Sequence, residues 1–104
     1  MIRKLEHNDK KNWAKLYNSY ADFYKVPMNT RILDTLWGWI QDETHDVNGI
    51  CFELVGKIVG IAHYRTMPRP IKGQYIGFLD DLFVKPEFRS QKIAQKMISH
   101  IKSL

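Results

Sequence analysis

The stretch that most constrains the fold runs from residue 78 to residue 94 of the 104-residue chain. It begins with a mostly apolar, β-forming sequence, turns at Pro86, and ends in a basic segment that leads into a helical pattern. A strand that delivers free backbone N–H groups at a helix N-terminus makes a site for an anion. The stretch therefore predicts a strand–turn–helix unit that binds an anionic ligand.

The rest of the chain shows helical and strand patterns joined by short connections. We expect strands at residues 2–5, 50–55, 58–64 and 74–84, and helices at residues 9–25, at residues 90–103 and after a cap at Asn29 or Thr30. We also expect a turn at residues 46–49, a two-residue hairpin turn at Gly56-Lys57 and a stiff basic loop at residues 67–73. This order predicts an α+β fold, with an antiparallel meander and helices packed on it.

The first predicted helix carries an aromatic stripe on one face. Its members are Trp13, Leu16, Tyr17, Tyr20 and Tyr24. Such a stripe indicates a core or an interface. Within the strands, Gly60 and Gly77 indicate a bulge or a close approach of another backbone, while Tyr64 and Tyr75 are expected to pack on the sheet.

Composition narrows the class of protein. The net charge is +5, from 16 Lys and Arg against 11 Asp and Glu, which suits a phosphorylated ligand. The sequence contains neither a zinc-binding pattern nor a nucleic-acid module, so we expect no metal and no nucleic acid as a partner. It contains no apolar stretch long enough to cross a membrane, and Cys51 is its single cysteine. We therefore expect a cytoplasmic protein that does not bind to or cross a membrane.

From Gly60 onward the sequence resembles the GNAT N-acetyltransferase superfamily. Residues 60–64 resemble its third strand, and residues 79–84 followed by Pro86-Glu87-Phe88-Arg89 resemble its fourth strand and acyl-CoA-binding turn. Within the superfamily, the strand is most like that of diamine and polyamine acetyltransferases, which read Leu-Glu-Asp-Phe-Phe-Val there. The resemblance implies a single GNAT-like domain over residues 1–104, with a mostly antiparallel sheet, helices on both faces and element order β-α-α-β-β-β-α.

The resemblance implies acetyl-CoA as the co-substrate. The strand backbone would pair with the pantetheine arm, and the turn and the start of the helix would hold the pyrophosphate, helped by the helix dipole. The cofactor-binding residues would then be Leu82, Phe83, Val84, Arg89, Ser90, Gln91, Lys92, Ile93, Ala94 and Gln95.

Two departures from the family pattern stand out. Lys92 occupies the position of a motif glycine, which lets phosphates approach the backbone closely. We expect this lysine to weaken acetyl-CoA binding rather than abolish it. Family members also continue beyond the last helix with a further strand and a further helix. The chain is therefore interpreted as a C-terminally truncated domain, which is either a fragment, a truncated gene product or half of a composite with another chain. A homodimer and such a composite are the two protein partnerships that this interpretation leaves open.

Asp80 is the candidate catalytic residue. It matches a glutamate that lies near the substrate amine in the polyamine enzymes, where a carboxylate binds the ammonium or accepts its proton. Asp80, Asp81 and Tyr24 are the candidate substrate-binding residues, and alternation along a strand would turn the two carboxylates to opposite faces. His63 is interpreted as a structural hydrogen-bonding residue, with a role as a base as the alternative. Cys51 is interpreted as structural.

The function predicted on this basis is transfer of an acetyl group from acetyl-CoA to a primary amine by direct attack in a ternary complex. The amine would belong to a polyamine, an amino acid, or a protein lysine or N-terminus. The alternative is a non-catalytic or incomplete GNAT remnant that acts as a binding or dimerisation module. A basic nucleic-acid-binding domain is the third and weakest reading.

Overall fold

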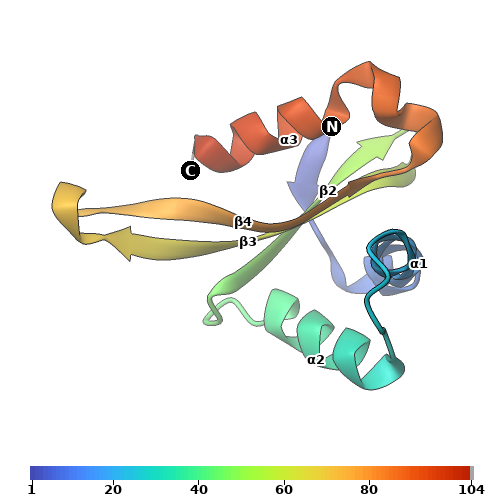
Figure 1. Cartoon of the computed structure of the whole chain (residues 1–104), viewed down its shortest axis with the longest axis horizontal. Helices are drawn as coiled ribbons and strands as arrows, with labels where there is room; N and C mark the ends of the chain where they lie inside the picture. The colour runs from blue at the N-terminus through green and yellow to red at the C-terminus, as the bar shows by residue number, and fades with distance from the viewer. Residues whose placement is uncertain (104) are drawn as a thin grey trace.

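A computed structural model describes residues 1–103 and contains one antiparallel sheet, whose strands lie in chain order (Figure 1). The strands are β1 (Ile2–Lys4), β2 (Val47–Leu54), β3 (Lys57–Arg69) and β4 (Gln74–Val84). Each strand pairs with its sequence neighbour, as in a meander. The predicted α+β class and element order are confirmed.

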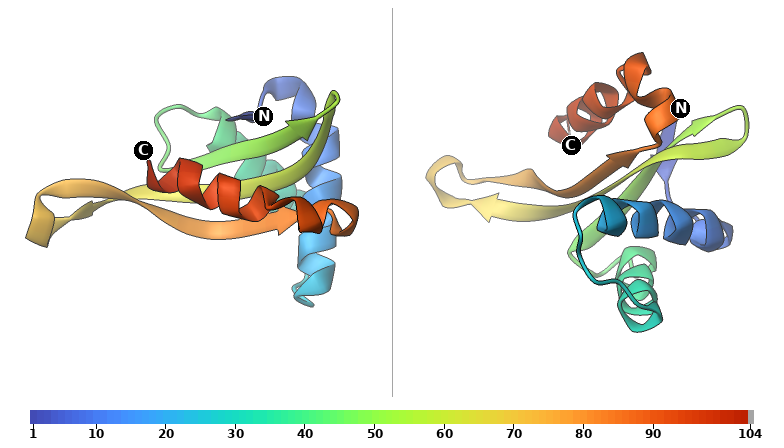
Figure 2. Two further views of the ribbon diagram at one scale, coloured as in Figure 1. Left: turned by 90° about the horizontal axis from the view of Figure 1, so that it is seen from above. Right: turned by 45° about the vertical axis from the view of Figure 1, so that its right-hand side comes forward.

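Helices cover both faces of this sheet, as the right-hand view of Figure 2 shows. The helices α1 (Lys10–Phe23) and α2 (Thr30–Gln41) lie on one face, and α3 (Ile93–Lys102) lies on the other. Asn29 caps α2, because its side chain accepts a hydrogen bond from the Ile32 N–H at 2.9 Å. The described residues also form three short 3₁₀ segments: η1 (His7–Asp9), η2 (Pro70–Lys72) and η3 (Pro86–Gln91).

The sheet separates two hydrophobic cores, and strand alternation assigns residues to each. On the α3 face, Ile93, Met97 and Ile101 pack against strand residues that include Ile50 and Ala62. On the other face, aromatic residues of α1 and α2 pack against the intervening strand positions. The members of this second core are Leu5, Trp13, Leu16, Trp37, Cys51, Ile58, Ile61 and Phe83. In β2 the period-2 pattern separates Cys51 from Ile50 and Phe52, whereas in β3 a register shift opposite Phe52 and Glu53 brings both Ile58 and Ile61 to the side of α1 and α2.

Several predicted boundaries are wrong because strand pairing extends further than local sequence indicates. Residues 67–69, predicted as loop, belong to β3, and the β3–β4 hairpin projects beyond the rest of the molecule (Figure 1). Residues 47–49, predicted as turn, open β2. The hairpin turn consists of Val55-Gly56 rather than Gly56-Lys57, since Leu54 pairs with Lys57. Tyr64 packs in the core as predicted, whereas Tyr75, on the projecting hairpin, is 73% exposed.

The last helix begins later than predicted. Residues 90 and 91 belong to η3, and α3 starts at Ile93 after Lys92, which adopts a left-handed backbone conformation with φ of 59°. Across residues 1–103, no helix combines the length and the apolar character needed to cross a membrane.

Candidate active site

A β-bulge in β4 brings the two adjacent carboxylates to one face of the sheet. Asp81 pairs with His63, and the next pair joins Leu79 to Tyr64, so Asp80 is an extra residue in the ladder. Both aspartates line one pocket between the sheet and α2. The expectation that they point to opposite faces is wrong, because the inserted residue cancels the alternation.

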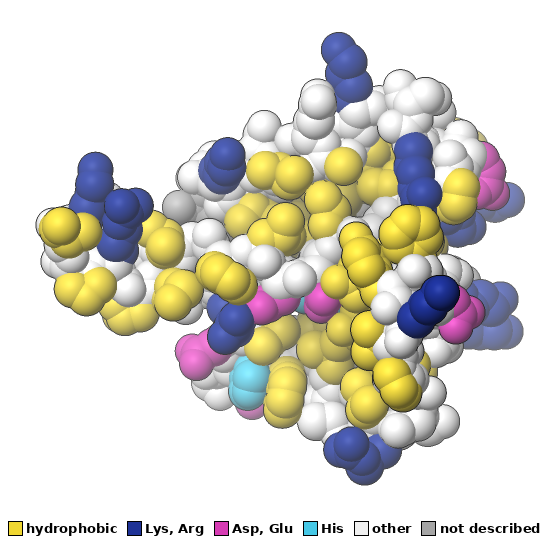
Figure 3. Space-filling view, in the orientation of Figure 1, with side chains coloured by type: hydrophobic (Ala, Val, Ile, Leu, Met, Phe, Trp, Pro, Cys, Tyr) yellow, Lys and Arg dark blue, Asp and Glu magenta, His cyan; other side chains and the backbone are white. Residues whose placement is uncertain are grey.

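This pocket, here called the bulge pocket, is lined by residues of α1 and α2, of β3 and β4, and of the start of β2 and the two residues before it. Its lining consists of Tyr17, Arg31, Ile32, Thr35, Leu36, Trp39, His45, Asp46, Val47, His63, Arg65, Asp80 and Asp81. In Figure 3, acidic side chains emerge on this face between the sheet and the helices below it, surrounded by hydrophobic side chains. A pocket of this composition suits a ligand that has a cationic group and an apolar body.

Asp80 is held by an arginine across the strands. Arg65 donates from Nε to Oδ2 at 2.9 Å and from Nη2 to Oδ1 at 2.7 Å, which is a bidentate ion pair. The guanidinium also lies over the Phe78 ring, 5.1 Å from its centroid. Asp80 is therefore charge-compensated at the mouth of the pocket, and a ligand ammonium has to compete with Arg65 for it.

Asp81 lies deeper and belongs to a hydrogen-bonded chain. The His63 ring contacts Asp81 Oδ2 through Nδ1 at 2.8 Å, and the Tyr17 hydroxyl donates to the same oxygen at 3.1 Å. On the other side of the imidazole, Trp13 Nε1 donates to His63 Nε2 at 2.9 Å. Both contacts to Asp81 end on Oδ2, and Oδ1 receives neither of them. The prediction that His63 is a structural hydrogen-bonding residue agrees with this geometry.

The electrostatics of the chain keep Asp81 ionised and the tyrosines protonated. Burial alone would raise the pKa of Asp81, but hydrogen bonds, first of all that from His63, bring that pKa below the ordinary value of 3.8. Burial and the nearby Asp81 carboxylate raise the pKa of Tyr20 to about 12, and they raise the pKa of Tyr17 as well. The site therefore presents one carboxylate next to hydroxyl groups that donate hydrogen bonds.

A second groove lies at the end of β4, where the predicted cofactor residues meet. This β4-end groove is lined by Phe23, Tyr24, Leu82, Phe83, Val84, Arg89 and Ala94. Tyr24, predicted to bind the substrate with Asp80 and Asp81, lines this groove and not the bulge pocket. Its position at the C-terminal end of α1 explains the separation, since the helix runs past the sheet from one site to the other.

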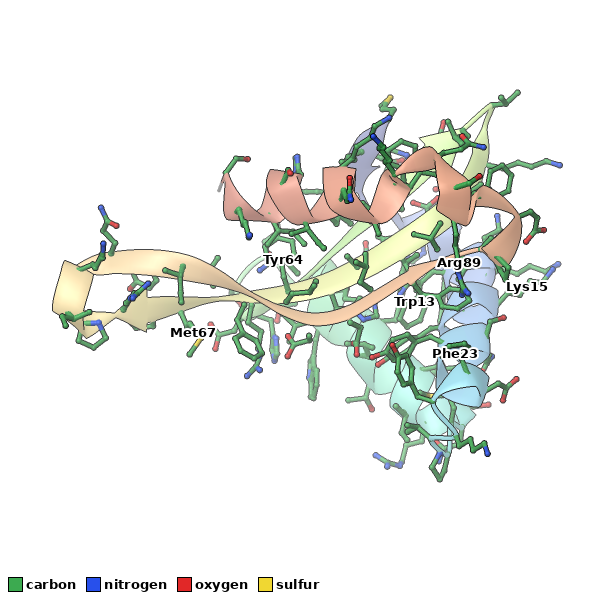
Figure 4. The ribbon with its side chains drawn as sticks, turned by 45° about the horizontal axis from the view of Figure 1, so that its top comes forward. Trp13, Lys15, Phe23, Tyr64, Met67 and Arg89 are labelled. Atoms are coloured by element: carbon green, nitrogen blue, oxygen red, sulfur yellow. The ribbon has the colours of Figure 1, made fainter. Side chains whose placement is uncertain are left out.

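Arg89 forms part of the wall of this groove. Its Nε donates to the Val84 carbonyl at 2.9 Å, and its guanidinium lies 5.3 Å from the Phe83 ring centroid and 5.6 Å from that of Phe23. Figure 4 shows Arg89 reaching from the turn after β4 towards Phe23 on α1. The contact joins the turn to α1 and leaves positive charge at the groove.

The first turn of α3 lies beside this groove, because its residue Ala94 is part of the lining. The N–H groups in the first turn of an α-helix have no partners within the helix, and here no side chain caps them. Ile93, Ala94 and Gln95 contribute that turn, and Ala94 also lines the groove. An apolar channel that leads to uncapped N–H groups fits a ligand with a slender apolar arm and an anionic group.

Three tyrosines, two on α1 and the third at its C-cap, connect the bulge pocket to the β4-end groove. The ring centroids of Tyr17 and Tyr20 are 5.5 Å apart, and those of Tyr20 and Tyr24 are 4.8 Å apart. Tyr17 lines the bulge pocket and Tyr24 lines the groove. The stripe that sequence periodicity identified therefore forms a wall shared by both sites.

Sequence reasoning missed two features of the site. Arg65 was not singled out, because its partner Asp80 reaches it only through the bulge. The bond between Trp13 and His63 was also missed, because it joins a helix to a strand 50 residues away. A usable signal did exist for Tyr17, which lies one helical turn from Trp13 on the same face.

Comparison with known proteins identifies the class. A model of the acetyltransferase (GNAT) family matches residues 13–104, and this chain belongs to that family. Members of the family use acetyl-CoA as the acetyl donor.

Particular relatives share the fold and a part of the sequence. The D-amino-acid N-acetyltransferase HPA3 of Saccharomyces cerevisiae is 25% identical over 105 residues, which cover 99% of this chain and 65% of HPA3. The ribosomal-protein-alanine N-acetyltransferase of Brucella melitensis biovar Abortus 2308 superposes with a TM-score of 0.77 at 25% identity, covering 95% of this chain and 66% of that one. The aminoglycoside N-acetyltransferase AAC(6')-Iy in complex with CoA superposes with a TM-score of 0.68 at 18% identity, and the match covers 99% of this chain and 68% of that one. This chain thus spans about two thirds of the length of these relatives.

Proposed function

We propose that this protein transfers the acetyl group of acetyl-CoA to a primary amine by direct attack within a ternary complex. The observation that carries the proposal is the arrangement along β4. The bulge pocket with its ionised Asp81 lies at one part of the strand, and the apolar groove beside the α3 N-terminus lies at its end. One strand therefore offers a site for an amine and a site for an acyl carrier.

The residues of the β4-end groove fit acetyl-CoA. Leu82, Phe83 and Val84 give an apolar channel suited to the pantetheine arm, and the first turn of α3 offers N–H groups to the pyrophosphate. Arg89 and Lys92 add positive charge near those phosphates. The remaining residues of the predicted cradle complete the turn between η3 and α3: Ser90, Gln91, Ile93, Ala94 and Gln95.

The bulge pocket would receive the acceptor. An ammonium must lose a proton before it attacks the thioester, and Asp81 can hold the ammonium and accept that proton directly or through water. The amine nitrogen then forms a bond with the acetyl carbonyl carbon, and the carbon–sulfur bond breaks. The products are the N-acetylated amine and the thiol of coenzyme A. Of the two protons that the ammonium loses, the first passes to Asp81 or water before the attack, and the second passes to the leaving thiolate.

Asp80 remains the predicted catalytic residue to be tested against Asp81. Its ion pair with Arg65 favours a role in shaping the pocket mouth, whereas the oxygen Oδ1 of Asp81 receives neither bond of the chain. Asp80→Asn and Asp81→Asn change one functional group each at adjacent positions. We expect Asp81→Asn to lower kcat/KM for the amine by about 100-fold and Asp80→Asn by less than 10-fold, within the range for a general base.

The acceptor class is proposed as an amine that has an apolar body, because hydrophobic side chains such as Leu36 and Trp39 accompany the acids in the pocket. Polyamines, amino acids and basic peptides form the assay panel. Turnover of acetyl-CoA with at least one of them supports the proposal. A second readout is amide hydrogen exchange: coenzyme A should protect residues 89–95. Absence of both turnover and protection at millimolar coenzyme A would refute the proposal.

The outer edge of β4 favours a second candidate function, that of an association module. β4 is the last strand of the sheet within the described residues, and Tyr75, Ile76 and Phe78 beside this edge are exposed. A second copy could pair there. Size-exclusion chromatography with light scattering would give a dimer mass for the natural chain and a monomer mass for an Ile76→Lys variant; a monomer in both cases refutes this candidate.

A further inference from the structure

The buried side of Asp81 is supported by two residues that the proposed reaction does not use directly. Trp13 of α1, His63 of β3 and Asp81 of β4 form a single line of hydrogen bonds, with contacts of 2.9 Å and 2.8 Å. Trp13 is fully buried and His63 is 1% exposed. Three separate elements are therefore joined at the point where the carboxylate enters the bulge pocket.

The donor chemistry of the indole fixes the tautomer of the imidazole. The Trp13 Nε1–H group can only donate, so His63 Nε2 must present its lone pair to it. The proton of the neutral ring then lies on Nδ1, which donates to Asp81 Oδ2. Because the Nε2 lone pair is already engaged, His63 does not serve as the base for an amine.

We propose that Trp13 and His63 are positioning residues that, through this single tautomer, hold the Asp81 carboxylate ionised and oriented towards the acceptor amine. The inference rests on the proposed function in so far as Asp81 receives the amine there. Loss of the Nδ1–H donor would leave a partly buried carboxylate short of one hydrogen bond, which favours its protonated form. Loss of the indole donor would leave His63 Nε2 without its partner, so that Asp81 alone would hold the ring in this orientation.

Other charged or titratable groups face Asp81 or line the bulge pocket, and each helix or strand around Asp81 contributes at least one of them. These groups are His63 and Arg65 on β3, Tyr17 and Tyr20 on α1, Asp80 on β4, Arg31 on α2, and His45 and Asp46 beside β2. None of the variants proposed below changes Tyr17, Tyr20, Arg31 or Asp80. A change in the titration of Asp81 in those variants is therefore attributable to the Trp13–His63 line.

The chain supplies a matched control in Trp37. Its ring centroid lies 4.8 Å from that of Trp13, and it is buried in the same core. Among residues 1–103, however, the Trp37 indole nitrogen has no hydrogen-bond partner. Trp13→Phe and Trp37→Phe thus remove similar buried volume, but only the first removes a hydrogen bond.

The experiment is a pH titration of the Asp81 carboxyl carbon by ¹³C NMR in the whole chain, with ¹⁵N NMR of the His63 ring. In wild type we expect an unprotonated Nε2 and a protonated Nδ1. His63→Leu should raise the Asp81 midpoint by about one pH unit, since it removes the donor. In His63→Asn the amide nitrogen can occupy the Nδ1 position and donate in its place. The Asp81 midpoint of this variant should therefore lie close to that of wild type. Trp13→Phe should give a smaller rise and a changed Nε2 signal, and Trp37→Phe should change neither the Asp81 midpoint nor the His63 signals.

The inference is overturned if wild-type His63 carries its proton on Nε2, or if the Asp81 midpoint is unchanged in His63→Leu. Should His63→Leu fail to fold, the wild-type tautomer and the comparison of Trp13→Phe with Trp37→Phe decide the question: an Asp81 midpoint that is equal in these two variants overturns the inference. These NMR results do not depend on turnover, so a chain that acetylates no amine refutes the proposed function and leaves this test intact. In an active protein, Trp13→Phe should move the acidic limb of the kcat–pH profile upward, and Trp37→Phe should not.

Discussion

Across the β3–β4 ladder, His63 lies opposite Asp81, and Tyr64 lies opposite Leu79. The ladder thus contains one residue more on β4 than on β3, and that residue is Asp80. The consequence is chemical: two adjacent carboxylates share one pocket, yet Arg65 compensates the first and His63 orients the second. A bulge therefore assigns different surroundings to side chains that the sequence presents as equivalent.

The first prediction concerns acid stability. The folded-state pKa of Asp81 lies below its ordinary value of 3.8, so its ionised form stabilises the fold above that value, and the stabilisation is lost as the pH falls through the folded-state pKa. We expect the free energy of unfolding to fall below about pH 4 in wild type and to fall less steeply in Asp81→Asn. Urea denaturation at a series of pH values measures this. Asp80→Asn is the control that retains the His63 contact, and an equal flattening in that variant would contradict the prediction.

The second prediction compares two glycines. A Cβ at Gly77 would lie 3.0 Å from Ile101 Cγ2 and 3.2 Å from the Ile101 carbonyl oxygen, whereas a Cβ at Gly38 meets nothing within 4 Å. Gly77→Ala should destabilise the fold by about 1–3 kcal/mol through overpacking. Gly38→Ala, in the exposed interior of α2, should stabilise it by about 1 kcal/mol. Chemical denaturation of both variants checks the opposite signs; a stabilised Gly77→Ala would show that α3 does not pack closely on β4.

Sequence periodicity predicted the elements that bury a regular face. The aromatic stripe of α1 and the strand at residues 74–84 follow from repeats of 3.6 and 2 residues, and both are confirmed. The period fails where the ladder gains a residue, as it does at Asp80, because no local residue signals the insertion. Residues 67–69 were missed for a related reason: Pro68 and Pro70 indicate a loop, but β4 pairs with this segment through Arg69.

The candidate site was predictable only in its local parts. The residues of the β4-end groove lie within a short sequence window, so one motif identifies them. The environment of Asp81 depends on Trp13 and His63, which reach it from distant positions in the chain. Such contacts require the strand register and the helix orientation together, and a single sequence specifies neither in advance.

The third prediction concerns the β2–β3 turn. Val55 and Gly56 both have positive φ, of 50° and 74°, as a two-residue type I′ turn requires. A β-branched residue is disfavoured there, and Val55 is fully exposed, so it gains nothing from packing. Val55→Asn should raise the free energy of unfolding by about 1 kcal/mol, since asparagine accepts this conformation. Val55→Thr, which keeps the branch, should show little gain; equal stabilisation by both would point to polarity instead.

The last prediction concerns Lys92, which stands between η3 and α3 with φ of 59°. The left-handed conformation costs an L-residue about 1–2 kcal/mol, and part of this cost is absent for glycine. Lys92→Gly should therefore stabilise the fold by about 1 kcal/mol, whereas Lys92→Ala, which loses the charge but keeps Cβ, should not. Thermal or urea denaturation separates the two variants, and equal stability of both would mean that the backbone is not strained at this position.

Coenzyme A binding to the same two Lys92 variants, measured by calorimetry, separates the effect of the lysine charge from that of the backbone shape. Lys92→Ala should bind more weakly than wild type because it loses a cation near the phosphates, and Lys92→Gly should recover affinity because the phosphates can approach its backbone more closely.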